Sequence, residues 1–293
     1  MNQIRAVISV SGQDQKGVVA RFATYLAGHG VNILDLEQQV AGGRFLMDML
    51  VDLAELDPET GLERLIPELV AEGGQIGMDV RVALASSPKD QAVAVLVSKE
   101  QHCLDVLIDR WEKDGFRGRI ACVLGNHPDL QEVAAEAGLP FAWKASTDKA
   151  AHFAWLGEQL QEHGAATVVL ARYMQIVPPD LVAAYPSRII NIHPSLLPHF
   201  PGANPYRRAW EAGARVAGCT AHYVTEQLDE GPIILQDVFP IDVGRDGAED
   251  VRAKGQKLEG RILAEAVRMH LDAKLVVVDG KVVFRPGLSA MLA

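Results

Sequence analysis

Two polar side chains at the end of one apolar segment offer the clearest chemistry in the sequence. The segment 189–204 reads IINIHPSLLPHFPGAN, and it carries Asn191 and His193 where a predicted strand runs into a proline-rich loop. Side chains alternate across a β-strand, so both residues are expected on one face. An amide and an imidazole side by side can donate to one carbonyl oxygen, which stabilises a developing oxyanion. The alternative is that Asn191 caps the loop and His193 bonds a backbone carbonyl.

An acidic residue further along the chain completes a candidate catalytic set. Asp229 lies in LDEGPIILQ, in a polar loop between two apolar stretches. Near His193, its carboxylate would serve as a general base or keep the imidazole protonated. Spacing in the sequence does not show that the two meet, and a plain turn residue is the other interpretation. The nine histidines include no H-E-x-x-H motif and no closely spaced pair, so no metal site is predicted.

The first part of the chain follows a ferredoxin-like pattern. Its elements alternate in the order βαββαβ, which is typical of that fold. The predicted strands are 3–11, 31–40, 44–53 and 75–84, and the predicted helices are 18–28 and a segment from Asp57-Pro58 to about residue 72. Glycines at 42–43 predict a turn, and glycines at 73–74 predict the end of the second helix. We therefore expect an N-terminal domain over residues 1–84.

The second part of the chain predicts an α/β domain. Residues 85–91 (ASSPKDQ) are small and polar and form the predicted linker to a domain over 92–293. Short apolar strands then alternate with helices, which predicts a doubly wound, mostly parallel sheet. These strands are AVAVLVS, RIACVLG, LPFAW, ATVVLA and SRIINIH. The tail differs: GCTAHYV and PIILQDVFPI are predicted as antiparallel strands, followed by a helix at about 247–271 and a hairpin at 275–284.

Composition narrows the class of protein. The chain has 293 residues, of which 48% are hydrophobic and 23% charged, as in a globular protein of about two domains. Its formal net charge of −10 argues against a nucleic-acid groove or an anionic membrane surface. No apolar run approaches the roughly 20 residues of a membrane span, and the N-terminus lacks a secretory signal, so a cytoplasmic protein is expected. Cys103, Cys122 and Cys219 are far apart and odd in number, which favours reduced thiols.

Several motifs resemble a known family. HPSLLPHFPGANP, GCTAHYV and LDEGPIILQ, in this order, resemble the folate-dependent formyltransferase and formyl hydrolase fold. VSKEQHCLDVLIDRW, GNHPDL and LARYMQI are similar to its formyltetrahydrofolate deformylase branch, whereas Pro194, after His193, is similar to the purine-pathway transferases. In the N-terminal part, DQKGVVA, HGVNI and GRFLMDM resemble an ACT domain, which implies a regulatory role.

The resemblance implies an activity and a set of site residues. It places the catalytic Asn, His and Asp of the family at Asn191, His193 and Asp229, and it implies transfer of the formyl group of 10-formyltetrahydrofolate to water. Formate and tetrahydrofolate would result, with no prosthetic group. The implied folate-binding residues are Gln175, Ile176, Val177 and the loop Thr225–Asp229, with His222 as a supporting group. A hydrogen-bonded sheet histidine is the alternative for His222.

The loop after the strand at 92–98 bears on the acceptor of the formyl group. The resemblance implies that purine transferases bind the phosphate of their amine acceptor on a glycine-rich loop here, where backbone N–H groups approach closely. This chain reads VSKEQHC, without glycine, and Glu100 would repel a phosphate. Hydrolysis is therefore expected. The alternatives are formyl transfer to another amine and an inactive, amino-acid-sensing regulatory protein.

The N-terminal module implies a partner and an effector. Its sheet has edge strands that must be covered or paired, so we expect a homo-oligomer through this module. The loop Asp14–Gly17 leads into a helix N-terminus, where backbone N–H groups can bind a carboxylate. Asn32 would reach the same ligand from a neighbouring subunit, and the resemblance implies a small amino acid such as glycine or methionine. The alternative is that Gly17 permits a tight turn and Asn32 caps it.

Overall fold

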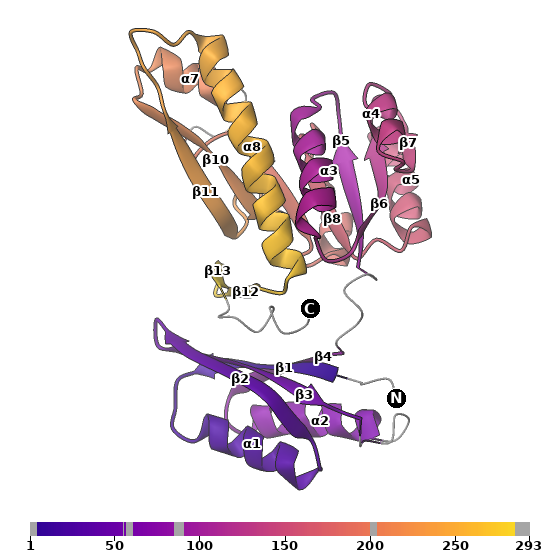
Figure 1. Ribbon diagram of the computed structural model, residues 1–293, viewed down its shortest axis with the longest axis vertical. Helices are drawn as coiled ribbons and strands as arrows, with labels where there is room; N and C mark the ends of the chain where they lie inside the picture. The colour runs from indigo at the N-terminus through magenta and orange to yellow at the C-terminus, as the bar shows by residue number, and fades with distance from the viewer. Residues whose placement is uncertain (1–4, 55, 57–60, 85–90, 200–203, 285–293) are drawn as a thin grey trace. The chain divides into compact units, whose positions relative to one another are not determined.

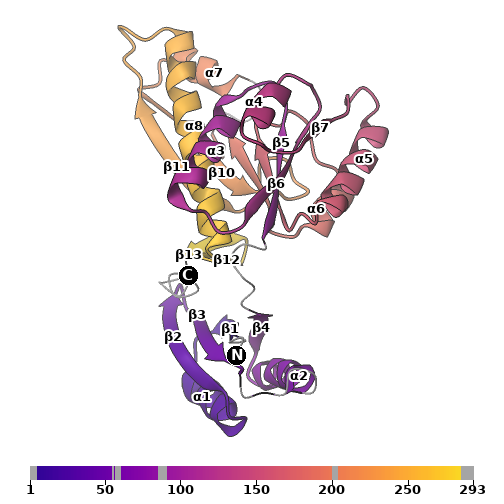
Figure 2. The same ribbon diagram turned by 45° about the vertical axis from the view of Figure 1, so that its right-hand side comes forward.

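The chain forms two compact units, which Figures 1 and 2 show as ribbons. The structure, a computed structural model, describes residues 5–54, 56, 61–84, 91–199 and 204–284. The first unit lies within residues 5–84 and the second within 91–284 of this described part. Of the predicted linker, residues 85–90 lie outside the described residues.

The N-terminal unit is a four-stranded antiparallel sheet with two helices on one face. Its strands follow the order β2-β3-β1-β4, and the βαββαβ prediction is confirmed. Apolar residues at helical spacing, Val18, Phe22 and Leu26, pack with strand residues such as Ile8 and Met49. The elements are β1 (Arg5–Gln13), α1 (Val18–Gly28), β2 (Asn32–Ala41), β3 (Arg44–Asp52), α2 (Gly61–Gly74) and β4 (Met78–Leu84).

Two glycine pairs in this unit have different roles. Gly42 and Gly43 both have positive φ angles, 58° and 79°, and form the predicted turn between β2 and β3. The prediction that glycine ends α2 at about residue 72 is wrong, because the helix continues through Gly74. A side chain at Gly73 would meet the side chain of Val80 and lie 2.9 Å from a backbone oxygen of β4. Gly73 therefore permits close packing of the helix on the sheet. The predicted helix start at 57–60 lies outside the described residues.

The second unit is built on a seven-stranded sheet in the order β11-β10-β9-β8-β5-β6-β7. The first five strands along the chain run parallel, while β10 is antiparallel to both β9 and β11, so the predicted mixed sheet is confirmed. The strands are β5 (Ala92–Val97), β6 (Arg119–Gly125), β7 (Phe141–Trp143), β8 (Thr167–Ala171), β9 (Ile189–His193), β10 (Val216–Tyr223) and β11 (Ile233–Pro240).

Helices cover both faces of this sheet, as a doubly wound fold requires. Strand β5 shows the consequence, because Val93, Val95 and Val97 pack into one core while Ala94 and Leu96 pack into the other. One face carries α3 (His102–Asp114), α4 (Gln131–Glu136), α7 (Pro205–Glu211) and α8 (Ala248–Leu271), and the other carries α5 (Lys149–Glu162) and α6 (Pro179–Ala184). The predicted C-terminal hairpin is present as β12 (Leu275–Val278) and β13 (Lys281–Phe284).

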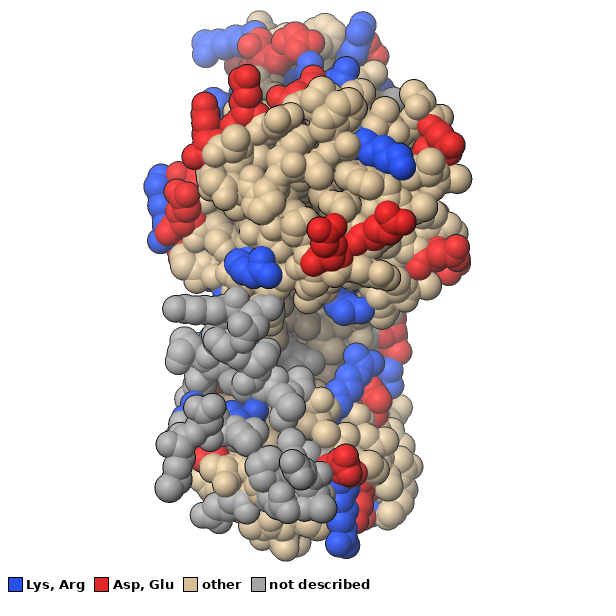
Figure 3. Space-filling view, turned by 90° about the vertical axis from the view of Figure 1, so that its right-hand side faces the viewer, with Lys and Arg blue, Asp and Glu red and all other residues tan. Residues whose placement is uncertain are grey.

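The surface carries charges of both signs. On the face in Figure 3, the Lys and Arg side chains of the described residues stand singly or beside acidic ones rather than as a broad basic patch. Among the helices that the structure describes, none is both long and apolar enough to cross a membrane.

Candidate active site

A cleft of about 600 Å³ opens at the carboxyl ends of the parallel strands. Its wall includes the end of β9 and the loops that follow β5, β8 and β10. Strand β5 is the topological switch point, because the chain continues to β6 on one side and β8 lies on the other. Open α/β sheets bind ligands at this position, and the volume is that of a small-molecule site.

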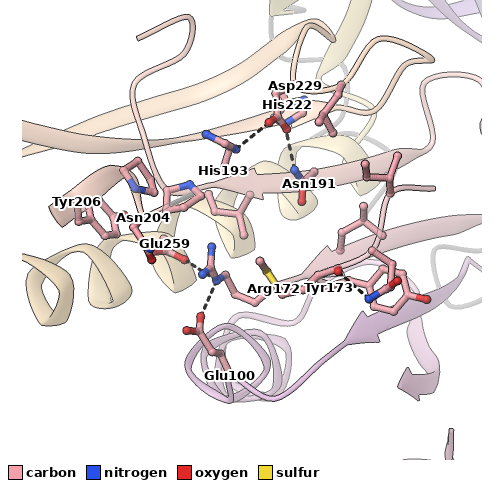
Figure 4. A pocket seen from close by; sticks show the side chains of 18 of the residues that line it. Glu100, Arg172, Tyr173, Asn191, His193, Asn204, Tyr206, His222, Asp229 and Glu259 are labelled. Atoms are coloured by element: carbon pink, nitrogen blue, oxygen red, sulfur yellow. Dashed lines mark hydrogen bonds and ion pairs between the residues drawn. The ribbon is translucent and has the colours of Figure 1, made fainter. Parts of the chain in front are cut away.

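The end of β9 positions the first two candidate residues. Asn191 and His193 both line the cleft, as expected from their alternation along the strand. The antiparallel pairing with β10 sets Asn191 opposite His222. Asn191 Nδ2 lies 3.1 Å from His222 Nε2 (Figure 4). The side chain of Asn191 therefore bonds a neighbouring strand, so the interpretation of Asn191 as a loop cap is wrong.

His222 holds the amide of Asn191 in one orientation. The imidazole is buried, and its Nδ1 lies 2.9 Å from the backbone oxygen of Tyr223. A carbonyl oxygen only accepts hydrogen bonds, so Nδ1 carries the proton and Nε2 accepts from Asn191. Burial lowers the pKa of His222, which keeps the ring neutral and suited to this acceptor role. The two interpretations of His222 are thus compatible, because its sheet hydrogen bonds are also what orient Asn191.

Asp229 reaches the same site from the loop between β10 and β11. Its Oδ2 lies 3.3 Å from His193 Nδ1, and its Oδ1 lies 3.8 Å from His222 Nε2. The hydrogen bond from His193 lowers the pKa of Asp229, against the opposing effect of burial, so the group is a carboxylate at neutral pH. The structure thus brings together the three residues that the sequence could not place side by side.

The backbone of this loop is tightly constrained. Asp229 has a φ angle of 59°, in the left-handed region that Asp tolerates better than most residues. Two residues later, a side chain on Gly231 would overlap the carbonyl oxygen of Tyr223. Gly231 therefore lets the loop pass directly over the end of β10, and this close passage fixes the carboxylate of Asp229 beside the two histidines.

His193 retains an unused hydrogen-bonding nitrogen. Its Nδ1 faces Asp229, so the interpretation that His193 bonds a backbone carbonyl is wrong. Its Nε2 is buried and has no hydrogen-bond partner within the described part of the protein. A buried polar atom without a partner costs about 1–3 kcal/mol, which a ligand atom at this position would recover. Nε2 therefore marks the place where a ligand oxygen would bind.

The expected folate-binding residues also line the cleft. Gln175, Ile176 and Val177 follow β8, and Thr225 follows β10. Leu228, in the predicted loop Thr225–Asp229, lines the cleft and is 62% exposed, and so does Met174, which is 64% exposed and which sequence reasoning missed. Large apolar side chains exposed at a cleft favour binding of a flat or apolar ligand. The position of Met174 next to the predicted Gln175 was the signal available in the sequence.

The other end of the cleft contains an ion-pair cluster of Glu100, Arg172, Arg252 and Glu259, which we call the charged end. Arg172 Nε lies 2.7 Å from Glu100 Oε2 and 3.4 Å from Glu259 Oε2 (Figure 4). Arg252 Nη2 lies 3.0 Å from Glu100 Oε1. Glu100, which was expected to repel a phosphate, is thus not an isolated charge, because both of its oxygens face arginines. Sequence reasoning missed Arg172, Arg252 and Glu259.

One group of side chains near this cluster has metal-ligand chemistry. Ligand atoms of His102, Cys103 and Glu259 lie within 4.8 Å of one another. Glu259 is already paired with Arg172 and with His102, whose Nε2 lies 3.1 Å away. Burial, together with the charge of Glu259, raises the pKa of the Cys103 thiol. These contacts disfavour a cation at this position.

The expected effector residues lie in the N-terminal unit. Gly17, with a φ angle of 88°, caps the N-terminus of α1, as predicted. The backbone N–H of Asp14 donates to the carbonyl of Gly43, beside the β2–β3 turn. Asn32 pairs with Asp52 at the opposite end of β3. Nine residues of extended strand separate these ends by roughly 25 Å, so one copy of the chain does not bring Asp14 and Asn32 together.

Comparisons with known proteins agree with this architecture. A formyl transferase family model matches residues 91–267, and an ACT domain model matches residues 5–83. The chain is 40% identical over 287 residues to the formyltetrahydrofolate deformylase of Bacillus subtilis, covering 96% of this chain and 94% of that protein. The chain belongs to the formyltetrahydrofolate deformylase family. The resemblance stated from the sequence is thereby confirmed.

Solved structures separate the deformylases from the transferases of the same fold. A formyltetrahydrofolate deformylase from Pseudomonas syringae is 34% identical and superposes with a TM-score of 0.85, covering 97% of this chain and 95% of its own. Glycinamide ribonucleotide transformylase 1 from Symbiobacterium toebii is 38% identical with a TM-score of 0.64, but covers only 67% of this chain. The deformylase similarity spans both units, so Pro194 does not remove the chain from the deformylase family.

Proposed function

We propose that this deformylase-family chain hydrolyses 10-formyltetrahydrofolate to formate and tetrahydrofolate, with Asn191, His193 and Asp229 as its catalytic residues. The observation that carries this proposal is the unpartnered Nε2 of His193, which lines the same cleft as the amide of Asn191 at the carboxyl end of β9. The similarity to deformylases along the whole chain supports the substrate and the reaction.

The first step is addition of water to the formyl carbon. The carbonyl oxygen becomes an oxyanion, which accepts hydrogen bonds from Asn191 Nδ2 and from Nε2 of a protonated His193. Two preorganised donors aimed at a developing negative charge stabilise the transition state more than they stabilise the neutral carbonyl. The barrier to the reaction is thereby lowered. The contact between Asn191 and His222 keeps one donor in place.

Asp229 stabilises the charge on His193 and transfers a proton from the attacking water to the folate. Its carboxylate pairs with His193 Nδ1, which stabilises the imidazolium while the oxyanion exists. The proton lost by the attacking water is accepted at Asp229 and delivered to N10 of the folate as the carbon–nitrogen bond breaks. The products are formate, with the new carbon–oxygen bond, and tetrahydrofolate protonated at N10.

The folate lies along the loops after β8 and β10. Gln175, Ile176, Val177 and Thr225 line this part of the cleft and offer both backbone polar groups and apolar side chains to the ring system. The exposed Met174 and Leu228 extend the apolar surface that the ring would cover. His222 acts as a positioning residue through Asn191.

The decisive test is turnover of 10-formyltetrahydrofolate by the purified protein without an amine. Release of formate, measured with a coupled dehydrogenase, is the expected result. Turnover that requires an added amine would indicate a transferase, and absence of turnover in both conditions would favour an amino-acid sensor. Either of these two results contradicts the proposal.

We infer that the N-terminal unit assembles two copies of the chain and binds an amino acid between them. Strand β2 is an edge of the sheet and carries exposed apolar side chains, Leu34 and Val40, which favour pairing with a second copy. The first turn of α1, after Gly17, has no side-chain cap and no acidic residue, so its N–H groups suit a carboxylate. Asn32 would contact the same ligand from the partner subunit.

This regulatory proposal predicts a measurable response to glycine or methionine. Each amino acid is titrated against the rate of formate release and against the melting temperature. A change in either quantity is expected for one of them, and Asn32→Ala should weaken it. If neither quantity changes, or if removal of residues 1–84 leaves the oligomer size unchanged, the regulatory proposal fails. We place the protein in the cytoplasm, in keeping with its three buried, free cysteines.

A further inference from the structure

The charged end of the cleft is not used by the hydrolysis mechanism. Glu100 follows β5 and Arg172 follows β8, so both stand at the edge of the sheet where parallel strands present loops to ligands. The loop that carries Glu100 leads directly into helix α3, an arrangement that commonly binds phosphate. The position is therefore one where a second, anionic substrate would be expected.

The charges at this end cancel one another. Each oxygen of Glu100 faces a different arginine, at 2.7 Å from Arg172 and 3.0 Å from Arg252. Arg172 also approaches Glu259, whose side chain is only 1% exposed. Burial alone would raise the pKa of Glu100, but hydrogen bonds from the two arginines hold it below its usual value. Two carboxylates thus match two guanidinium groups.

The backbone at Arg172 is shaped for this contact. Its φ angle of 61° is in the left-handed region, which side chains other than those of Gly, Asn and Asp seldom adopt. The planar guanidinium then lies between Glu100 and Glu259 with its side chain 15% exposed (Figure 4). Arg172 and Glu259 are therefore the buried part of the cluster, and Arg252, which is 51% exposed, joins it from the surface.

We propose that Glu100 fills the charged end with a carboxylate of the chain itself, and so excludes a phosphorylated amine as formyl acceptor. The inference rests on the proposed hydrolysis. An acceptor amine has to reach the formyl carbon beside His193, so the remainder of that acceptor must occupy the rest of the cleft. In this chain, the arginines there already bind Glu100, whose carboxylate would lie against the incoming phosphate.

The chemistry at the formyl end does not by itself choose the acceptor. With an amine, a new carbon–nitrogen bond forms, the bond to N10 breaks, and the proton lost by the amine passes to N10. With water, a carbon–oxygen bond forms in the same way. Both reactions pass through a tetrahedral oxyanion that Asn191 and His193 can stabilise. The choice therefore depends on which acceptor can enter, and water needs no anion-binding site.

The test removes the carboxylate of Glu100 and titrates phosphate in the absence of folate. Glu100→Ala removes the carboxylate that Arg172 and Arg252 share, so calorimetry should detect inorganic phosphate binding roughly tenfold tighter than in the wild type, or more. Glu249→Ala is the matched control: Glu249 lies 3.7 Å from Arg252 and is 87% exposed, and its loss leaves Glu100 in place. This control is expected to show no gain in phosphate binding.

A second readout follows the acceptor itself. With 10-formyltetrahydrofolate and glycinamide ribonucleotide, Glu100→Ala is expected to form the N-formyl product, and the wild type is expected to form none. If Glu100→Ala fails to fold, Glu100→Gln keeps the shape of the side chain and removes its charge, and a several-fold gain in phosphate binding is expected. Folded variants that bind phosphate no better than the wild type would overturn the proposal.

The two proposals fail in different ways. A wild-type protein that releases no formate contradicts the proposed hydrolysis, yet the phosphate titration needs no turnover and still tests the charged end. A wild-type protein that releases formate and also formylates glycinamide ribonucleotide contradicts only the exclusion of that acceptor.

Discussion

The two ends of the cleft differ in whether their polar atoms have partners within the protein. At the formyl end, His193 Nε2 is buried and has no partner among the described residues. At the charged end, both oxygens of Glu100 are matched by arginines. An end that binds substrate keeps hydrogen-bonding capacity unused, which costs stability in the free protein. At the end that we propose excludes a substrate, the polar side chains instead bond to one another. Variants at each end should therefore affect different properties.

The largest effect is expected from the loss of one charge at the formyl end. Asp229→Asn keeps the shape of the side chain and removes the carboxylate that pairs with His193. We expect formate release to fall by roughly three to four powers of ten, as in other His–Asp pairs, while folate binding remains. Glu230→Gln, in the same loop but outside the cleft, is the control and should keep its rate. Comparable rates for the two variants would show that Asp229 is only a turn residue.

The proposed oxyanion donors should come next in size. His193→Ala or Asn191→Ala removes one donor, and kcat should fall by roughly two to three powers of ten. Folate affinity, measured by calorimetry, should change little, because the proposed ring contacts are on the loops after β8 and β10. A purified variant of either residue with near-normal turnover would refute its assignment.

At the charged end, the main loss should be in stability. Arg172→Met leaves Glu259 buried without its guanidinium, and breaking such a pair is expected to lower the free energy of unfolding by about 3 kcal/mol. Urea denaturation measures this difference. Arg207→Met is the control, since Arg207 and its partner Glu211 are exposed, and it should change stability very little. Equal stabilities for the two variants would contradict the comparison.

The smallest effect is expected at His222, which acts only through Asn191. His222→Leu removes the acceptor for Asn191 and should slow formate release roughly tenfold, because a misplaced donor weakens stabilisation of the oxyanion. His222→Gln should restore part of the rate, since its amide oxygen can accept the same hydrogen bond. A structural role alone would show no such rescue.

The same residue gives the reaction a pH dependence. Burial lowers the pKa of His222 below its usual value of about 6.5, so the ring is neutral at pH 7 and gains a proton only in more acidic solution. Protonated Nε2 cannot accept from Asn191, so the rate should fall as the pH drops through this pKa. The pKa of Asp229 is also lowered, and its protonation should reduce the rate only below about pH 4. His222→Gln should lack the first of these two steps.

The sequence predicted the features that depend on local pattern. Alternation along 189–193 placed Asn191 and His193 on one face, and apolar strands between helices indicated the doubly wound sheet. Helices α6 and α7 were missed because six and seven residues are too short to show helical periodicity. The contact between Asn191 and His222 depends on the register of β9 with β10, which a single sequence does not reveal.

The charged end shows why the effect of a charged residue is hard to predict from the sequence without knowing its partners. Glu100 looked repulsive in the sequence because its partners come from distant elements, Arg172 from the loop after β8 and Arg252 from α8. Only the fold brings these side chains together. The charge of Glu100 is balanced by these two arginines. The cluster nevertheless supports the expectation that water, rather than a phosphorylated amine, accepts the formyl group.

The roughly 25 Å between Asp14 and Asn32 within one sheet has a consequence for regulation. A ligand that needs both residues is bound only by a pair of chains, so effector binding and self-association must strengthen each other. The response to an amino acid would then depend on the concentration of the protein itself. In a dilute assay the activity would not change at an effector concentration to which a concentrated protein solution responds. Adding more effector would raise the apparent molecular mass of the dilute sample.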